Sequence, residues 1–148
     1  MRRSLKTGRM SALAVVLDAS AVLALLKDEE GADTVVQLLT ESTVAESGHT
    51  GLLSTVNLVE VRQYASDKAL AQLERADSPI AILPFTAEHA SRAAALRERT
   101  RAFGLSLADR ACLALGLGTG LTVVTAEHIW LKLDVGVTVS HIRPWTLG

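Results

Sequence analysis

The sequence has 148 residues, which is enough for one domain with a substantial core and too few for two. Hydrophobic residues make up 49% and charged residues 21%, a globular balance that argues against a disordered chain. The net charge of −1 argues against a protein that binds nucleic acid by phosphate neutralisation alone, since such proteins carry a basic excess. Any nucleic acid would be held locally, with bound cations supplying positive charge. Cys112 is the only cysteine, which excludes an intramolecular disulfide and a cysteine zinc cluster.

Short apolar runs alternate with amphipathic stretches along the chain. In chain order, strands are expected at residues 14–17, 52–54, 80–83, 121–125 and 137–142. Helices are expected at residues 21–27, 31–39, 56–66, 67–75, 86–99, 106–117 and 127–133. Ser20 is expected to cap the first helix and Thr86 the long one, while Ser78 and Pro79 break the helix before them.

This alternation predicts an α/β fold with three layers, in which a central parallel sheet of four to five strands carries helices on both faces. In such sheets ligands bind beyond the carboxyl ends of the strands. Residues 1–10 are basic and polar and are predicted to be a disordered extension, which leaves 11–148 as a single domain. The apolar runs at 12–17 and 80–83 are too short to cross a bilayer, so a cytoplasmic protein without a membrane segment is expected.

Four acidic residues stand against apolar neighbours: Asp18, Glu60, Asp109 and Glu127. Asp18 follows the first predicted strand and Glu127 follows the fourth, while Glu60 and Asp109 fall near the starts of helices. Each has a simpler interpretation when taken alone. Asp18 would cap the next helix, Glu60 would be an exposed helix residue, and Glu127 would match a helix dipole.

Asp109 has the strongest simple interpretation, because Ser106 and Asp109 form the spacing of a capping box. Taken together, however, all four acids can converge on one edge of a parallel sheet. Converging carboxylates raise one another's pKa unless a cation neutralises them. Mg²⁺ or Mn²⁺ fits such oxygen ligands, and the chemistry that the site would support is phosphodiester hydrolysis.

Four ordered segments resemble the motifs of PIN-domain nucleases, and most closely those of VapC-like toxins of toxin–antitoxin modules. The segments are Val-Val-Leu-Asp-Ala-Ser-Ala at 15–21, Asn-Leu-Val-Glu-Val at 57–61, Gly-Leu-Ser-Leu-Ala-Asp-Arg-Ala-Cys-Leu-Ala-Leu at 104–115 and Thr-Ala-Glu-His-Ile-Trp at 125–130. The third segment is the most specific. The resemblance spans roughly residues 15–143, nearly the whole predicted domain.

The resemblance implies an endoribonuclease whose Mg²⁺ or Mn²⁺ is bound by Asp18, Glu60 and Asp109. The supporting polar residues would be Ser20, Asn57, Ser106, Thr125 and Arg110. The fourth motif usually offers Asp where this chain has Glu127, whose side chain is one methylene longer. Glu127 would therefore either reach the metal or its water, or only shape the edge of the site.

The resemblance also implies partners: an RNA substrate such as tRNA or rRNA, a cognate antitoxin that blocks the site from a groove beside it, and a second copy in a homodimer. Two other functions stay open. The chain would be a PIN-like protein-binding module if its acids bind no metal. It would be a Mg²⁺-dependent phosphatase if Asp18 were a nucleophile, although such enzymes usually carry a second acid where Ser20 stands.

The remaining candidates have plain interpretations. The four histidines are scattered without metal-ligand spacing and are expected on the surface or in loops: His49, His89, His128 and His141. Cys112, Trp130 and Trp145 are expected to be packing residues. The basic residues at positions 92, 97, 99 and 101 form either a solvated helix face or a contact for RNA or an acidic partner. Arg110 would hold a phosphate or balance the acid beside it.

Overall fold

The computed structural model of the chain describes residues 14–42 and 48–144. The predicted extension at 1–10, part of the polar loop before the second strand, and Trp145 lie outside the described residues. Within the described residues, no helix is both long and apolar enough to cross a membrane.

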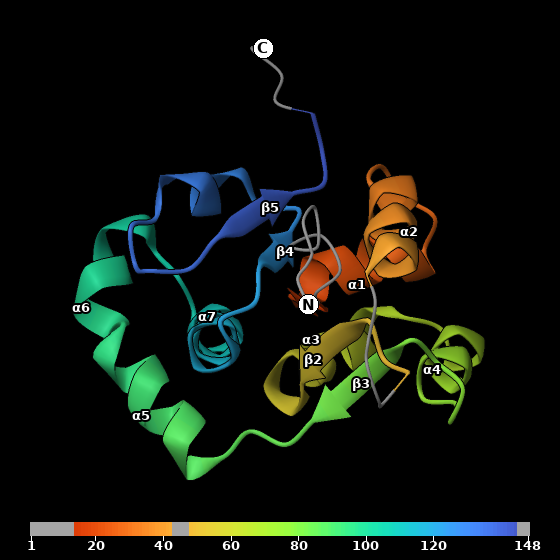
Figure 1. The fold of residues 1–148 in the computed structure, drawn as a ribbon, viewed down its shortest axis with the longest axis horizontal. Helices are drawn as coiled ribbons and strands as arrows, with labels where there is room; N and C mark the ends of the chain where they lie inside the picture. Colours follow the sequence, from red (N-terminus) through yellow and green to blue (C-terminus); the bar gives the residue numbers. More distant parts are fainter. Residues whose placement is uncertain (1–13, 43–47, 145–148) are drawn as a thin grey trace, which may run out of the picture.

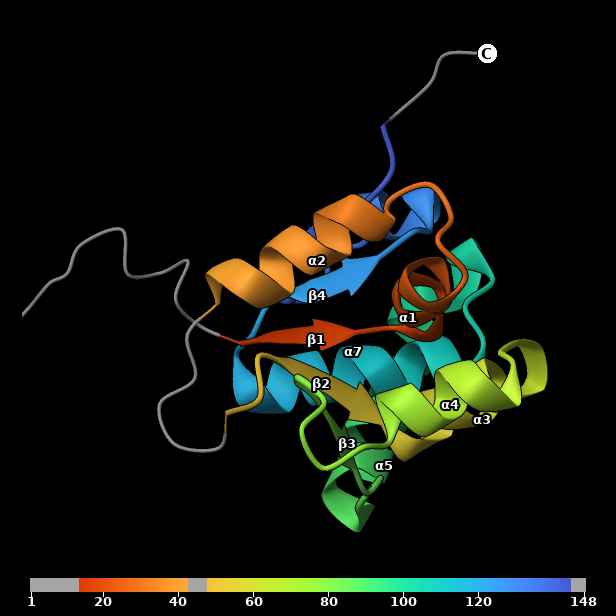
Figure 2. The ribbon, with the colours of Figure 1, turned by 90° about the vertical axis from the view of Figure 1, so that its right-hand side faces the viewer.

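The described residues form one sheet of five parallel strands in the order β3-β2-β1-β4-β5. The strands are β1 (Val15–Leu17), β2 (Gly51–Ser54), β3 (Ile80–Leu83), β4 (Val123–Thr125) and β5 (Val139–His141). Each strand lies within its predicted run, except that β2 begins one residue earlier. Figure 2 shows β1 between β4 and β2, so the first predicted strand is the centre of the sheet.

Two buried clusters cover the two faces of the sheet, as the alternation of side chains along a strand requires. Val15 and Leu17 belong to one cluster, and Val16 between them belongs to the other. The first cluster is completed by α1 (Ala19–Leu26), α2 (Ala32–Glu41) and α4 (Asp67–Leu73), with Val61 of α3 (Thr55–Tyr64). The second is completed by α7 (Leu107–Thr119), by Leu96, and by Trp130 of the 3₁₀ helix η3 (His128–Lys132). The predicted three-layer α/β/α architecture is confirmed.

Figure 1 shows the same division, with α5 (Ala87–Ala95), α6 (Arg97–Thr100) and α7 on one side of the sheet and α1, α2 and α4 on the other. Cys112 and Trp130 are buried in the second cluster, as expected for packing residues. The sheet itself is short, because β1, β4 and β5 have three residues each. The carboxyl ends of the central strands β1 and β4 therefore lie only three residues from their starts and directly next to the buried core.

The structure corrects several predicted helix boundaries. The first helix begins at Ala19 and its cap is Asp18, whose side chain accepts a hydrogen bond from the Ala21 amide; Ser20 lies inside the helix. The predicted helices before Pro79 are separate, because Ala65 is extended and Ser66 starts α4 as a new cap.

The predicted helix at 86–99 is also interrupted. It begins after Thr86, as expected, but divides into α5 and α6 at Leu96, whose side chain is buried in the second cluster. The short helix after β4 is 3₁₀ rather than α, since the Trp130 amide donates to the carbonyl of Glu127 three residues earlier.

Candidate active site

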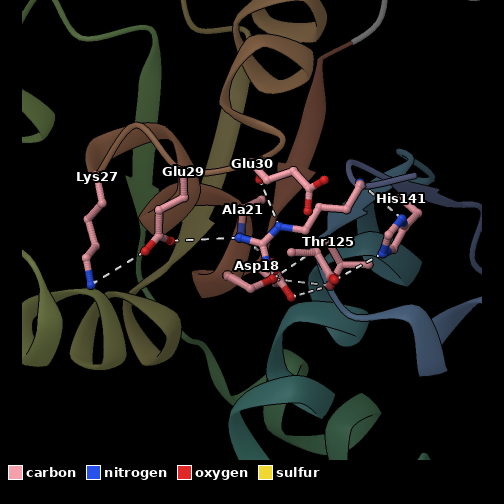
Figure 3. A network of polar contacts seen from close by, with 10 residues as sticks. Asp18, Ala21, Lys27, Glu29, Glu30, Thr125 and His141 are labelled. Carbon is pink, nitrogen blue, oxygen red and sulfur yellow. Dashed lines mark hydrogen bonds and ion pairs between the residues drawn. The ribbon is translucent and has the colours of Figure 1, made fainter. Parts of the chain in front are cut away.

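Asp18 leaves the end of β1 at the centre of the sheet and is buried, with 4% of its surface exposed. Its Oδ1 accepts hydrogen bonds from the Ser20 hydroxyl at 2.7 Å and the Ala21 amide at 2.9 Å. Its Oδ2 accepts one from the Thr125 hydroxyl at 2.6 Å. Figure 3 shows Thr125 and Ala21 approaching Asp18 from two different elements, the end of β4 and the start of α1. Three donors therefore fix this carboxylate in one orientation.

The two hydroxyls beside Asp18 are themselves held by the turn after β4. The Ala126 amide donates to Ser20 Oγ at 2.9 Å, and the Glu127 amide donates to Thr125 Oγ1 at 3.0 Å. Because each hydroxyl accepts from an amide, its hydrogen remains available for Asp18. One continuous set of hydrogen bonds thus connects the turn that carries Glu127 with the carboxylate of Asp18.

Burial opposes the charge on Asp18. The pKa of Asp18 is raised from 3.8 to about 6, chiefly because burial removes water from the carboxylate. The hydrogen bonds from Thr125, Ser20 and Ala21 act in the opposite direction, and the negative charge of Asp109 raises the pKa further. Burial dominates, so the side chain titrates close to neutral pH.

The second part of the site lies where α3 meets α7. Asn57 is buried on α3 and its Nδ2 donates to the carbonyl of Ala108 at 3.0 Å, which ties the two helices together just before Asp109. Asp109 closes the capping box that its spacing predicts. Its Oδ2 accepts from the Ser106 amide at 2.9 Å, and its own amide donates to Ser106 Oγ at 3.1 Å.

Glu60 lies one turn after Asn57 and is half-buried. Its pKa is raised by burial first, and then by the negative charges of Asp109 and Glu127. The negative charge of Asp109 thus acts on both Asp18 and Glu60, and that of Glu127 acts on Glu60. The fold therefore brings together acids that are separated by up to 109 positions in the sequence, from the ends of two strands and the starts of two helices.

The donor set suits a hard divalent cation, because it consists of carboxylate oxygens that repel one another in its absence. Asn57 Oδ1 is a buried acceptor without a hydrogen-bond partner, on the turn of α3 that leads to Glu60. Among residues 14–42 and 48–144, however, no three His, Cys, Asp or Glu side chains are already arranged to hold a metal ion. The chemistry of the side chains fits such an ion, and their present geometry would have to close around it.

The model of the PIN domain family matches residues 15–135, from β1 to the segment after η3. The chain belongs to the PIN domain family. The predicted resemblance is thereby confirmed at the level of the family, over all four segments that carried it. No curated protein sequence matches this chain.

Solved structures share the fold of this PIN domain at low sequence identity. A chain of the DNA-bound VapBC structure from Salmonella typhimurium is 19% identical, with a TM-score of 0.64, and the match covers 87% of this chain and 98% of that one. A chain of DNA-bound VapBC2 from Rickettsia felis is 14% identical, with a TM-score of 0.66, and the match covers 87% of this chain and 98% of that one. VapC20 from Mycobacterium tuberculosis, a sarcin-ricin loop cleaving toxin, is 17% identical, with a TM-score of 0.59, and the match covers 84% of this chain and 99% of that one.

A cleft of about 410 Å³ lies beside Glu60 in this PIN domain, between α3 and the start of α7. Its lining is largely apolar and includes three exposed side chains, Val59, Tyr64 and Leu107, which are 58%, 61% and 60% exposed. Large apolar side chains gathered on a surface mark a binding site more often than an accident of composition. The cleft opens next to the acids, so whatever fills it lies beside Glu60.

The basic residues contribute less to the site than their sequence positions suggested. The Nη1 atom of Arg110 donates to the carbonyl of Ala93 at 3.0 Å, a bond that joins α7 to α5. Arg92 pairs with Glu88 of its own helix and Arg101 with Glu98, as on an ordinary solvated helix face. Arg99 donates to the carbonyl of Asp134. These contacts favour the structural interpretation of the arginine cluster.

Two of the four histidines that were expected on the surface or in loops are instead half-buried, His128 in η3 and His141 in β5. The rings of His128 and His141 stack with their centroids 3.9 Å apart and their planes inclined by 24°. His141 lies on β5 and its Nε2 is 3.0 Å from the carbonyl oxygen of Ala126, in the turn that holds Ser20. Sequence reasoning missed this pair because 13 positions separate its members and neither stands in a metal-binding spacing.

Proposed function

We propose that this PIN domain is a Mg²⁺- or Mn²⁺-dependent endoribonuclease and the toxin of a toxin–antitoxin pair. The observation that carries the proposal is Asp18. A buried carboxylate at the carboxyl end of the central strand, held by three donors and close enough to Asp109 to feel its charge, lowers the stability of the fold, which is typical of a functional group rather than a structural one. Paired acids with raised pKa at such an edge are typical of functional sites.

In the proposed site Asp18, Glu60 and Asp109 hold the metal ion. A divalent ion held there would lower the pKa of an attacking water and stabilise charge on the leaving oxygen. It would also supply the positive charge that a chain of net charge −1 lacks for binding a phosphate.

The protein's own residues orient these parts. Thr125 and Ser20 fix the direction of Asp18, and Asn57 fixes the spacing of α3 and α7. Glu127 is exposed at the edge of the site, where its carboxylate orients the water. Water attacks the phosphorus in line, the bond to the 3′ oxygen breaks, and the products are a 5′-phosphate and a 3′-hydroxyl with no covalent enzyme intermediate.

The phosphatase alternative finds no support in the geometry. The position of the expected second acid is taken by Ser20, whose hydroxyl donates to Asp18.

The toxin role is supported by the fold shared with VapBC chains and by the cleft beside Glu60. An antitoxin segment that places apolar side chains against Val59, Tyr64 and Leu107 would cover the acids and block RNA. Homodimerisation remains a prediction of the same resemblance, and a cytoplasmic location remains a prediction of the sequence. Since VapC20 cleaves the sarcin-ricin loop, rRNA belongs beside tRNA in the first substrate pool.

The test is cleavage of a mixed tRNA and rRNA pool with Mn²⁺ or Mg²⁺, compared with EDTA and with the Asp109→Asn variant. The proposal expects metal-dependent cuts with 5′-phosphate ends that both controls abolish. The matched control is Asp67→Asn, which removes an exposed acid in the first turn of α4 and should leave cleavage intact.

Calorimetry with Mn²⁺ separates the two ways in which cleavage could fail. Binding that Asp109→Asn weakens means that the metal site exists and the substrate was missing from the pool. If no Mn²⁺ binds and no RNA is cut, the nuclease assignment is wrong and the protein-binding module takes its place.

A further inference from the structure

Four hydrogen bonds run in one direction from the end of β5 to Asp18. The Arg143 amide donates to His141 Nδ1 at 3.1 Å, and His141 Nε2 lies 3.0 Å from the Ala126 carbonyl oxygen. The Ala126 amide donates to Ser20 Oγ at 2.9 Å, and the Ser20 hydroxyl donates to Asp18 Oδ1 at 2.7 Å. Figure 3 shows His141 on the far side of Thr125 from Asp18, at the start of this series.

The partners of His141 determine which of its nitrogens carries the proton. The Arg143 amide is a donor only, so Nδ1 must accept and has no hydrogen. The Ala126 carbonyl is an acceptor only, so Nε2 must donate. The geometry therefore requires the neutral imidazole with hydrogen on Nε2, and no other form satisfies both contacts.

The ring is also held in place from two other sides. It stacks on His128 at 3.9 Å. The residue that sets its tautomer is itself anchored, because Arg143 Nε donates to the carbonyl of Glu30 at 2.8 Å and its guanidinium lies 3.8 Å from Glu29. His141 is thus a rigid donor that fixes the Ala126 carbonyl.

We propose that His141 is a positioning residue of the active site, acting through Ala126 and Ser20 on Asp18. This inference rests on the proposed function, which makes Asp18 part of the catalytic site. By holding the Ala126 carbonyl, His141 fixes the turn at Ala126, whose own amide donates to Ser20 Oγ, and the hydroxyl hydrogen of Ser20 then points at Asp18. If this turn moved away, Ser20 could rotate toward Thr125 Oγ1, which lies 3.4 Å from it.

The Ala126 carbonyl shares its peptide group with the Glu127 amide, which donates to Thr125 Oγ1 at 3.0 Å, so the contact from His141 also sets the direction of Glu127. Without the bond from His141, the Ala126 carbonyl loses its hydrogen-bond donor, and the positions of Ser20 and Glu127 are less tightly fixed. Small displacements of groups that orient a reactant lower kcat more than they change binding.

Two substitutions separate positioning from simple packing. His141→Gln keeps a side-chain N–H donor of similar reach, whereas His141→Leu keeps bulk without the donor. We expect His141→Leu to lower kcat about tenfold with KM unchanged, as for other residues that orient a ligand from behind, and His141→Gln to recover most of that loss. His89→Gln, a histidine substitution in the capping box of α5, is the matched control and should leave kcat unchanged.

A measurement that needs no activity tests the geometry directly. Imidazole ¹⁵N–¹H correlation spectra of the wild-type protein should show His141 as the neutral form protonated at Nε2. Amide hydrogen exchange at Ala126 should be slow in wild type and in His141→Gln, and fast in His141→Leu.

A proton on Nδ1 of His141 at neutral pH overturns the inference. So does a His141→Leu variant with unchanged kcat, or a His141→Gln variant that loses as much as His141→Leu. If the wild-type protein cuts no RNA under any metal, the proposed function fails, and the spectra and amide exchange still decide whether His141 holds the Ala126 turn.

Discussion

The two halves of the proposed active site are built differently. On the sheet side, between β1 and β4, Asp18 is buried and accepts three hydrogen bonds from groups that are themselves hydrogen-bonded. On the helix side, between α3 and α7, Glu60 is half-buried and has no hydrogen bond or ion pair within the described residues. Asp109 is engaged by a helix cap rather than by the site.

The difference separates the part that is fixed in advance from the part that is free to respond. Burial and hydrogen bonds hold Asp18 in one orientation and raise its pKa to about 6. The acids on the helix side repel one another and can move when a cation or a partner arrives. A substitution on the sheet side should therefore change both stability and chemistry, and one on the helix side chiefly ligand binding.

The largest effect is expected for Asp18→Asn, which should lower cleavage about a thousandfold while making the metal-free protein more stable at neutral pH. The folded pKa of about 6 lies above the unfolded value of 3.8, so ionised Asp18 destabilises the fold as pH rises from about 4 through 6, and fully above that. Removing the charge should raise the free energy of unfolding at pH 7.5 by about 1 to 3 kcal/mol. Thermal unfolding in EDTA checks this.

Asp33→Asn is the matched control for Asp18→Asn, because Asp33 is exposed in the first turn of α2 and should change neither quantity much. Added Mn²⁺ should raise the melting temperature of the wild-type protein and not that of Asp18→Asn. An Asp18→Asn protein that is less stable than wild type at pH 7.5 would mean that the hydrogen bonds to the carboxylate outweigh its burial.

The second effect concerns Glu127, on the exposed edge of the site. We expect Glu127→Gln to lower kcat about tenfold, since an exposed carboxylate that orients water contributes less than a metal ligand. Glu127→Asp places the carboxylate where the family usually has it and should retain activity. Steady-state kinetics of both variants with saturating Mn²⁺ checks this. Equal losses in the two variants would show that the reach of the glutamate matters more than its charge.

The sequence predicted the layers of the fold well because period-2 and period-3.6 patterns depend on burial, which the structure confirms for both faces of the sheet. It could not decide local choices that depend on tertiary contacts. The sequence offers both Asp18 and Ser20 as the cap of the first helix; Asp18 caps α1, and Ser20 instead accepts a hydrogen bond from Ala126, 106 positions later in the chain. No pattern near Ser20 carries that information.

The acids of the site could be chosen from the sequence because charges among apolar neighbours are conspicuous. Their individual environments could be predicted only in part. The capping box of Asp109 follows from its spacing to Ser106, whereas the burial of Asp18, at 4% exposure, depends on contacts with distant parts of the chain. The arginines and His141 show the same limit, since their partners are backbone carbonyls that any sequence would offer.

The third effect is expected for Thr125→Val, which removes the hydroxyl from Asp18 Oδ2 and keeps the shape of the side chain. The Thr125 hydrogen bond lowers the pKa of Asp18, so its loss should raise that pKa further. Activity that requires ionised Asp18 falls as pH drops through this pKa, and the acidic limb of the pH–rate profile should move to higher pH in Thr125→Val. At pH 7.5 the loss should be severalfold, about what one hydrogen bond contributes.

The limb is measured as kcat against pH with saturating Mn²⁺ for wild type and Thr125→Val side by side. Thr119→Val, which removes a hydroxyl bonded to the carbonyl of Leu115 at the far end of α7, is the matched control. A limb that stays in place in Thr125→Val would assign it to a group other than Asp18.

The smallest effect is expected for Ser106→Ala, which opens the capping box of α7. Ser66→Ala removes a similar cap from α4, away from the acids. Both should lower the free energy of unfolding by about 1 kcal/mol. Only Ser106→Ala loosens the turn that carries Asp109, so only this variant should change the affinity for Mn²⁺ in calorimetry, by a few-fold. If the two variants bind Mn²⁺ equally well, the helix cap does not position Asp109 for the ion. The acids on the helix side would then bind the cation without being oriented in advance by the hydrogen bonds of the fold.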